Sequence, residues 1–305
     1  MNQPTPPNQP VRTESANEAS RGLDTWPSQR ILASFLQGQR QAIDAVERAL
    51  PAIAKAAEAS LPRLKRRGRL IYVGAGTSGR IGVQDGVELY PTFDWPWDRL
   101  GFLMAGGEPA LMRAVEGAED DRRAASEDVA RLAIDKEDVV LAIAASGTTP
   151  YTLCVVEEAR KAGALTIGFA SNSGTPLLAA AEHAVLLDTG VEVIAGSTRL
   201  QAGTAQKAAL NLLSSLVMIR LGRVYDGHMV DMRATNAKLV KRAERMLIQI
   251  TGTTPETARA ALEKTQGRVK PAVLVVKGLS AEEAEKALER AEGSLRAALA
   301  NLPPP

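Results

Sequence analysis

The chain has 305 residues, which is enough to bury a large core and predicts one full α/β domain with a smaller appendage. Its 37 lysine and arginine residues nearly balance 35 aspartate and glutamate residues, so no overall charge favours nucleic acid or a membrane as a partner. No apolar stretch approaches the roughly 20 residues that span a bilayer, and the N-terminus lacks a secretory signal. With a single cysteine, Cys154, and no histidine at metal-ligand spacing, we expect a cytoplasmic protein without disulfides and without a histidine-rich metal site.

The predicted elements alternate between helix and strand over most of the chain. Residues 1–12 are rich in proline and amide side chains, and we expect a flexible tail there. Apolar residues recur at helical spacing from 27 to 65, where Pro51 either kinks one helix or opens a second. Five short apolar runs, separated by helical patterns, favour buried strands at 70–73, 100–104, 139–144, 165–170 and 185–187. This alternation predicts a doubly wound, mostly parallel five-stranded sheet with helices on both faces.

After residue 231 the pattern changes to helices alone. Thr254 before Pro255 and Ser280 before Glu283 are typical of helix starts. The run 272–276 has the composition of a strand in surroundings that favour a helix. We therefore expect a main domain over residues 13–248 and a small helical domain over 249–305.

Small and hydroxyl-bearing residues follow three of the predicted strands, in loops 74–79, 145–150 and 171–176. The carboxyl ends of parallel strands meet at one edge of a sheet, where such folds bind ligands. In the first loop, glycines let the backbone turn while amides at the next helix start attract an anion, which predicts a phosphate site. For the third loop, ordinary helix capping is the favoured explanation. The candidate phosphate-binding residues are Thr77, Ser78, Gly79, Ser146, Gly147 and Thr149.

The first loop also matches the spacing of the dinucleotide-binding GxGxxG motif, which is a weak signal by itself. Thr77 and Ser78 place hydroxyls where that motif usually has none. The acid expected about twenty residues further on would be Asp94, in a predicted loop. Both features oppose a nicotinamide cofactor, and a glycine-rich turn without a ligand is the remaining alternative for this loop.

Beyond these patterns, an ordered series of motifs from about residue 13 to 300 resembles the N-acetylmuramic acid 6-phosphate etherase family. The resemblance implies a sugar isomerase (SIS) domain over 13–248 and a small helical domain similar to ubiquitin-associated domains. It also implies a cytoplasmic homodimer, a sugar-phosphate substrate and no metal or organic cofactor. The motifs are Thr-Glu at 13–14 with Asn17, Gly-Ala-Gly-Thr-Ser-Gly-Arg at 74–80, Ala-Gly-Gly-Glu at 105–108, Val-Glu-Gly-Ala-Glu-Asp at 115–120, Ala-Ala-Ser-Gly at 144–147, Gly-Ser-Thr-Arg at 196–199, Ala-Gly-Thr-Ala-Gln-Lys at 202–207, and Met-Val-Asp at 229–231 with Arg-Ala-Thr-Asn at 233–236.

This resemblance implies cleavage of the lactyl ether of N-acetylmuramic acid 6-phosphate with water, giving N-acetylglucosamine 6-phosphate and D-lactate in the recycling of cell-wall sugars. The family's two catalytic acids fall on Glu88, as the acid, and Glu119, as the second acid/base group, and the opposite assignment stays open. Opening the sugar ring makes C2–H acidic, so one carboxylate can remove this proton while the other carboxyl protonates the departing C3 oxygen. Ser197, Thr198 and Lys207 are candidates for a second layer around the site.

The chain departs from the family pattern at three places, with Leu89 and Tyr90 in place of Cys-Pro, Thr148 in place of Arg, and Leu200 and Gln201 in place of Met-Lys. Because Arg and Lys bind phosphate, the last two changes bear on substrate affinity. Three alternatives remain: a sugar-phosphate-binding regulator similar to glucokinase regulatory protein, an aldose–ketose isomerase on the same fold, and a dinucleotide-dependent oxidoreductase. The joint presence of Glu88 and Glu119 favours the etherase over a binding module, because paired acids serve acid/base catalysis.

Overall fold

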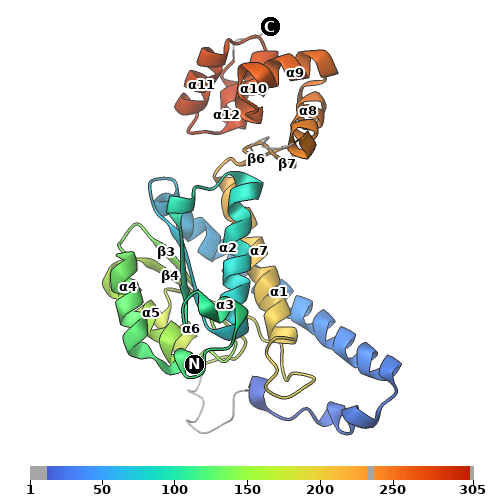
Figure 1. Ribbon diagram of the computed structural model, residues 1–305, viewed down its shortest axis with the longest axis vertical. Helices are drawn as coiled ribbons and strands as arrows, with labels where there is room; N and C mark the ends of the chain where they lie inside the picture. Colours follow the sequence, from blue (N-terminus) through green and yellow to red (C-terminus); the bar gives the residue numbers. More distant parts are fainter. Residues whose placement is uncertain (1–11, 233–236, 303–305) are drawn as a thin grey trace. The chain divides into compact units, whose positions relative to one another are not determined.

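A computed structural model describes residues 12–232 and 237–302 of the chain (Figure 1). Most of the predicted N-terminal tail and the Arg-Ala-Thr-Asn motif at 233–236 therefore lie outside the described residues. The chain divides into two compact units. The first combines Met1–Gly86 with Asp98–Ser214, and the second combines Val87–Trp97 with Ser215–Pro305. Each unit has its own hydrophobic core.

In the described part of the chain, the first unit is built on a sheet of five strands in the order β2-β1-β3-β4-β5. All neighbouring strands in this sheet are parallel, which confirms the predicted sheet. β1, β3 and β4 are buried along their whole length, as expected of apolar runs covered on both faces. The strands are β1 (Leu70–Gly74), β2 (Leu100–Met104), β3 (Val139–Ile143), β4 (Leu165–Ala170) and β5 (His183–Leu186).

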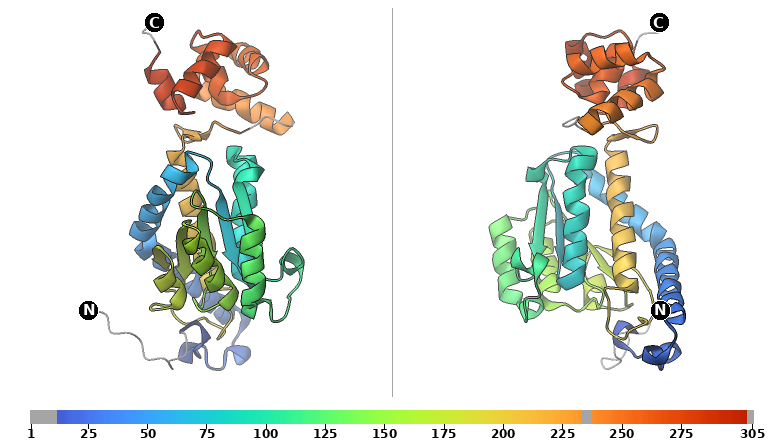
Figure 2. Two further views of the ribbon diagram at one scale, coloured as in Figure 1. Left: turned by 90° about the vertical axis from the view of Figure 1, so that its left-hand side faces the viewer. Right: turned by 45° about the vertical axis from the view of Figure 1, so that its right-hand side comes forward.

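Helices cover both faces of this sheet (Figures 1 and 2). They are α1 (Ser28–Leu64), α2 (Gly76–Phe93), α3 (Pro109–Met112), α4 (Arg122–Leu132), α5 (Pro150–Lys161), α6 (Pro176–Ala180) and α7 (Gln201–Arg220), with the 3-10 helices η1 (Arg12–Glu14), η2 (Glu18–Ser20), η3 (Leu23–Thr25), η4 (Trp97–Arg99) and η5 (Ala118–Asp120). Successive strand residues point to opposite faces. Ile71 and Val73 belong to the core cluster formed with α4, α5 and α6. On the other face, Tyr72 and Ile143 approach α2 at Gly82, where a Cβ atom would lie 3.0 Å from the Ile143 side chain.

The N-terminal helical pattern forms one helix, α1, which continues through Pro51 and Pro62. A proline in a helix interior removes one backbone hydrogen bond and usually kinks or breaks the helix. Here the buried side of α1 runs without a gap across Pro51, from Ala49 to Ile53, so packing holds the two halves as one element. Among residues 12–232 and 237–302, none of the helices has the length and apolar character that a bilayer crossing requires.

The second unit is mainly helical, and within it the described residues from 249 onward form helices, as the sequence pattern indicates. Ser280 and Glu283 form a capping box, and Thr254 caps its helix through the amide of Thr257, so both predicted helix starts are confirmed. The ambiguous run 272–276 is helical because Val273 and Leu274 are buried among neighbouring helices. The elements are β6 (Val224–Tyr225), β7 (His228–Met229), α8 (Ala237–Thr251), α9 (Pro255–Lys264), α10 (Val269–Val276), α11 (Ala281–Arg290) and α12 (Leu295–Ala300).

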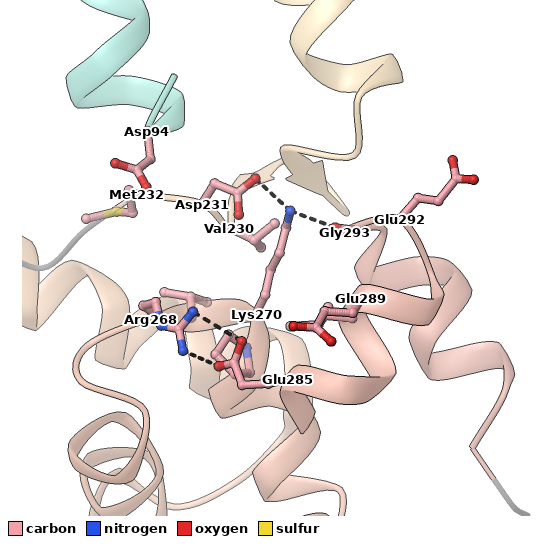
Figure 3. A pocket seen from close by; sticks show the side chains of 13 residues that line it. Asp94, Val230, Asp231, Met232, Arg268, Lys270, Glu285, Glu289, Glu292 and Gly293 are labelled. Atoms are coloured by element: carbon pink, nitrogen blue, oxygen red, sulfur yellow. Dashed lines mark hydrogen bonds and ion pairs between the residues drawn. The ribbon is translucent and has the colours of Figure 1, made fainter. Parts of the chain in front are cut away.

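An ion pair between a buried lysine and a half-buried aspartate lies in the second unit (Figure 3). Lys270 Nζ donates to Asp231 Oδ2 at 2.6 Å and to Gly293 O at 2.8 Å. Burial lowers the pKa of Lys270, and the Asp231 carboxylate opposes this effect. The pair joins the segment after β7 to α10 and to the turn between α11 and α12.

Candidate active site

The loop between β1 and α2 brings two backbone segments very close together. A Cβ atom on Gly74 would lie 2.7 Å from the Gly79 amide nitrogen, and one on Gly79 would lie 2.2 Å from Met104 Sδ. Both distances are shorter than a side chain allows, so glycine is required at these two positions. The Gly79 amide also donates to Ala75 O at 3.2 Å and closes the first turn of α2. The loop therefore has the tight turn that the glycine pattern predicts.

The first turn of α2 offers anion-binding groups at the carboxyl edge of the sheet. The amides of Gly76, Thr77 and Ser78 lie in this turn, where an α-helix supplies no carbonyl partner, and the helix dipole adds partial positive charge. Thr77 is half-buried. Ser78 is buried, and its hydroxyl donates to Gln206 Oε1 at 3.0 Å. Gln206 lies within the Ala-Gly-Thr-Ala-Gln-Lys motif at 202–207, but the sequence assigned it no role, because its partner Ser78 is distant in the chain.

The second and third loops lie against each other beyond β3 and β4. The Leu177 amide donates to Gly147 O at 3.0 Å and joins the two loops. Ser146 Oγ accepts the amide of Thr148 at 3.2 Å, which leaves the hydroxyl hydrogen of Ser146 to donate elsewhere. The two loops therefore form one polar surface at the edge where α2 begins.

Hydroxyl groups in these two loops do not cap their own helices. Thr149 and Thr175 are the N-cap residues of α5 and α6, yet within the described structure neither side chain accepts a hydrogen bond from its helix. Thr175 Oγ1 and Ser171 Oγ are buried and have no hydrogen-bond partner among the described residues. A buried unpaired hydroxyl costs about 1–3 kcal/mol, so a group that pairs with it is stabilising. Ordinary capping is therefore the wrong explanation for Thr175.

Part of the N-terminal segment folds onto the same edge. Thr13 is fully buried, and its hydroxyl accepts Asn172 Nδ2 at 3.2 Å. Asn172 Nδ2 also donates to Ala145 O at 3.0 Å. The carbonyl of Thr13 accepts the Gly196 amide at 2.9 Å. Thr13 thus connects the loop after β4 with the loop that leads into α7.

The start of α7 packs against the start of α2. A Cβ atom on Gly203 would lie 3.5 Å from Thr77 Cγ2, an ordinary contact distance. Ser197 and Thr198 are half-buried in the loop before α7, and Thr198 O accepts the Gly203 amide at 2.8 Å. Lys207 is exposed in the second turn of α7. The residues around Gly203 therefore share the edge of the phosphate loop.

A buried carboxylate occupies the N-terminus of α7. Glu192 is fully buried and accepts the amides of Gln201 at 3.0 Å and Ala202 at 2.9 Å. Burial raises the pKa of Glu192, and the two amides lower it in part. Because the chain's own carboxylate already binds this helix start, α7 does not offer the open anion site that α2 offers.

Glu119 lies in the loop after β2, within η5. Its side chain is exposed, whereas the neighbouring Ala118 packs against the core cluster. Arg80 donates to Ala110 O at 2.8 Å and to Leu111 O at 3.0 Å, so the same loop is fastened to the first turns of α2. Glu119 therefore belongs to a loop at the ligand edge.

Glu88 lies on α2 itself, and its side chain is exposed. It follows Thr77 by eleven residues. An α-helix rises about 1.5 Å per residue, so roughly 16 Å along the axis separates these two positions. Glu88 is therefore distant from Thr77 along α2, and it falls in the Val87–Trp97 segment of the second unit.

Known proteins resemble this chain over most of its length. The model for the N-terminal SIS domain of glucokinase regulatory protein matches residues 52–160, and the SIS domain model matches residues 122–216. An N-acetylmuramic acid 6-phosphate etherase of Deinococcus radiodurans is 53% identical over 264 residues, which cover 87% of both chains. Proteins of the same name in Shouchella clausii and Cronobacter sakazakii are 44% and 45% identical, cover 86% of this chain, and are themselves covered to 89% and 88%. The chain belongs to the N-acetylmuramic acid 6-phosphate etherase family.

Membership in the etherase family and the SIS matches confirm the predicted fold class. One departure from the family pattern now has a structural account. Gln201 is buried, and its side-chain amide donates to Thr189 O at 3.1 Å and to Val191 O at 3.3 Å. This glutamine fixes the chain before α7. By contrast, Thr148 is exposed at its loop and no cation takes its place there among the described residues of that loop.

A buried acid of this etherase-family chain, Asp85, was not selected from the sequence. It lies one turn before Glu88 on α2 and accepts hydrogen bonds from Tyr72 Oη at 2.7 Å, from Asn211 Nδ2, and from Ser214 Oγ at 3.2 Å. Burial raises the pKa of Asp85, and the three donors lower it in part. Asp85 ties α2 to β1 and α7. Its position on the buried side of an amphipathic helix was the available sequence signal.

A pocket of about 450 Å³ in the second unit is a poor match for a phosphate ester (Figure 3). Its cations are already paired, Arg268 with Glu285 and Lys270 with Asp231. Further carboxylates, including Glu289 and Glu292, line the same pocket. Because the field inside is dominated by negative groups, this pocket is not a candidate phosphate site.

Proposed function

We propose that this protein is an enzyme that cleaves the D-lactyl ether of N-acetylmuramic acid 6-phosphate with water, in the recycling of cell-wall sugars. The products are N-acetylglucosamine 6-phosphate and D-lactate. The observation that carries the proposal is the polar edge of the sheet, where the first turn of α2 meets hydroxyl groups that do not cap their own helices. Relatives named for this activity are 42–53% identical to the chain.

In this proposal the phosphate group binds at the start of α2. The free backbone amides of residues 76–78, the close turn at Gly79, the Thr77 and Ser78 hydroxyls, and the loop residues Ser146, Gly147 and Thr149 surround it. Hydrogen bonds to an ionised acceptor are roughly twice as strong as neutral ones, and the helix start adds favourable charge. Neutral donors can therefore hold the phosphate without the arginine that Thr148 replaces. Ser197, Thr198 and Lys207 form the outer layer of the same site.

Glu88 and Glu119 are the proposed acid/base pair. One carboxylate removes the C2 proton of the ring-opened sugar, and the other carboxyl protonates the C3 oxygen as lactate departs. The unsaturated aldehyde then accepts water at C3. For the second role a carboxyl must be protonated near neutral pH, which requires burial. Both side chains are exposed in the single chain, so substrate or a second subunit must cover them.

The position of Glu88 supports a homodimer in which each subunit supplies this residue to its partner's site. Six bonds of about 1.5 Å separate phosphorus from C2, so C2 lies within about 9 Å of the phosphate. The helix start binds the phosphate beyond Thr77, whereas Glu88 lies roughly 16 Å further along α2. The same chain's Glu88 is therefore too distant to act on a sugar whose phosphate it binds. In a twofold dimer, the Glu88 of one subunit can reach the sugar whose phosphate the other subunit binds. The symmetry then makes the two sites equivalent.

An apolar stripe on α1 is the proposed contact surface of this dimer. Leu32, Leu36, Ile43 and Leu50 are exposed, at 67%, 53%, 51% and 45% respectively. Their spacing of four and then seven residues places them on one side of the helix, as in a coiled-coil seam. Large apolar side chains in such a row are stabilised by burial against another subunit.

The direct test measures D-lactate release from N-acetylmuramic acid 6-phosphate by the purified protein. Wild type should release lactate, and Glu88→Gln and Glu119→Gln should each lose at least about a hundredfold in rate, as expected when a general acid or base is removed. Glu127→Gln, which changes an exposed acid on α4, serves as the control and should keep the wild-type rate. A folded wild type that binds N-acetylglucosamine 6-phosphate but releases no lactate would point instead to a sugar-phosphate-binding regulator.

A further inference from the structure

The most informative group that the proposed reaction does not use is the buried side chain of Gln206. It lies on α7, only 1% of its surface is exposed, and its Oε1 accepts the Ser78 hydroxyl at 3.0 Å. Its other amide atom, Nε2, is buried without a hydrogen-bond partner among the described residues. A buried amide with two unpaired donors is rare in folded proteins and costs stability. The orientation of the Gln206 amide therefore determines both its hydrogen bond with Ser78 and which of its atoms stays unpaired.

The two amide atoms of a glutamine exchange places when the amide group rotates by 180°. In the orientation described, Ser78 donates its only hydroxyl hydrogen to Gln206 and has none left for a phosphate. In the rotated orientation, Nε2 donates to Ser78 Oγ, and the Ser78 hydrogen is free to point toward the start of α2. A carbonyl oxygen then takes the unpaired position, which is less costly for an acceptor than for a donor.

We propose that Gln206 is a positioning residue for the phosphate site, whose amide turns when an anion binds and directs the Ser78 hydroxyl hydrogen onto the phosphate. The role of Gln206 rests on the proposed function in one respect, namely that a phosphate ester binds at the start of α2. Gln206 does not itself touch the ligand, since Nε2 is buried. It acts because an amide, unlike a carboxylate, can either accept from Ser78 or donate to it.

Two substitutions of similar size separate donation from packing. Gln206→Glu keeps the shape, and in its ionised form it can only accept, so at a pH where it is ionised it holds the Ser78 hydrogen and adds a negative charge. Gln206→Met keeps the volume and removes the hydrogen bond, so Ser78 can turn freely. We expect the dissociation constant for inorganic phosphate, measured by calorimetry, to rise at least about tenfold for Gln206→Glu and only a few-fold for Gln206→Met, since one charge-assisted hydrogen bond is at stake.

Ser214→Ala is the matched control, because Ser214 is a buried polar residue on the same helix whose hydroxyl donates to Asp85, away from Ser78. This variant should lower the melting temperature without changing the dissociation constant for phosphate. Equal phosphate affinities for Gln206→Glu and wild type would overturn the proposal. So would equal losses of affinity in all three variants, since that result would reflect packing alone.

A double-mutant cycle tests whether Gln206 acts through Ser78. In a Ser78→Ala background, Gln206→Met should leave phosphate affinity unchanged, because the hydroxyl that it positions is absent. An additional loss equal to that seen in wild type would contradict the positioning role. In turnover, Gln206→Glu should raise KM and leave kcat within about twofold, as for an interaction made equally in ground and transition states. Because phosphate binding is measured without turnover, failure of the etherase activity would leave this test intact and distinguishable.

Discussion

A Cβ atom on Gly147 would lie 2.3 Å from Thr175 Oγ1. Gly147 also has a φ of +73°, which disfavours any residue with a side chain. These two residues come from different loops, after β3 and after β4. The close contact explains why glycine is required here, and it means that the two loops change position only together.

Gly147→Ala should therefore destabilise the protein by about 2 kcal/mol or more, since a strained backbone and an overpacked contact each cost about 1 kcal/mol or more. Gly190→Ala is the control, because Gly190 has a similar φ of +76° but its added Cβ atom would lie 3.7 Å from Arg12 Nη2, an ordinary contact distance. We expect Gly190→Ala to show only the backbone part, about 1–2 kcal/mol. Urea unfolding of both variants measures the difference, and equal losses would show that the Thr175 contact relaxes.

Mixed dimers test the exchange of Glu88 between subunits. Glu88→Gln and Glu119→Gln chains, each inactive alone, should regain activity when they are co-expressed with different tags. Every mixed dimer then has one site with both carboxylates, so a random mixture should reach about a quarter of the wild-type rate per chain. Purified mixed dimers should reach about half. If each site used acids from one chain only, mixing would restore nothing, even where the two tags co-purify.

Asp85→Asn should change how stability depends on pH. Burial raises the pKa of Asp85 in the folded state above its ordinary value of 3.8, so the folded state binds more protons than the unfolded state between these two values. In that window wild type loses stability as pH rises. The variant lacks this loss, so its free energy of unfolding relative to wild type should improve from about pH 4 upward. Thermal unfolding at several pH values measures the trend, and a constant difference would contradict the raised pKa.

Lys270→Met should destabilise the second unit by about 1–3 kcal/mol, because it removes a charge-assisted hydrogen bond from the partly buried Asp231. The partner is Asp231, which lies 2.6 Å from Lys270 Nζ and 3.8 Å from Arg223 Nη1. Lys277→Met is the control, since Lys277 is exposed at the end of α10. Its effect should stay within about 0.5 kcal/mol, as for most surface substitutions. Urea unfolding checks both variants, and similar small effects would indicate that Arg223 replaces the lost charge.

The sheet was predictable because its strands are short, apolar and separated by helical patterns. β2 and β4 begin and end at the predicted residues. The course of α1 was not predictable, since Pro51 alone indicates a kink or a new helix. The helix continues through Pro51 because Ala49 and Ile53 are both buried on the same side of it. This is a tertiary effect, which local helix propensity does not predict.

The site was predictable only where backbone geometry dictates the residue type. Glycines at 74 and 79 and hydroxyls at helix starts are enough to indicate a phosphate loop. Gln206 and Asp85 were not predictable, because their roles come from residues more than a hundred positions away, Ser78 for one and Asn211 for the other. Glu88 was assigned from the family resemblance, and its distance from Thr77, which follows from helix geometry, supports the proposed exchange of this residue between subunits.

The contact between Thr13 and Asn172 also bears on the order in which the protein is made. The two residues are 159 positions apart in the sequence. At about 5–20 residues per second, the ribosome needs roughly 8–30 s after Thr13 before Asn172 exists. During that time the segment around Thr13 lacks its native contact with Asn172. It is therefore accessible to chaperones and proteases until β4 and the loop after it have been made. This edge of the sheet therefore cannot mature before the loop after β4 has been made.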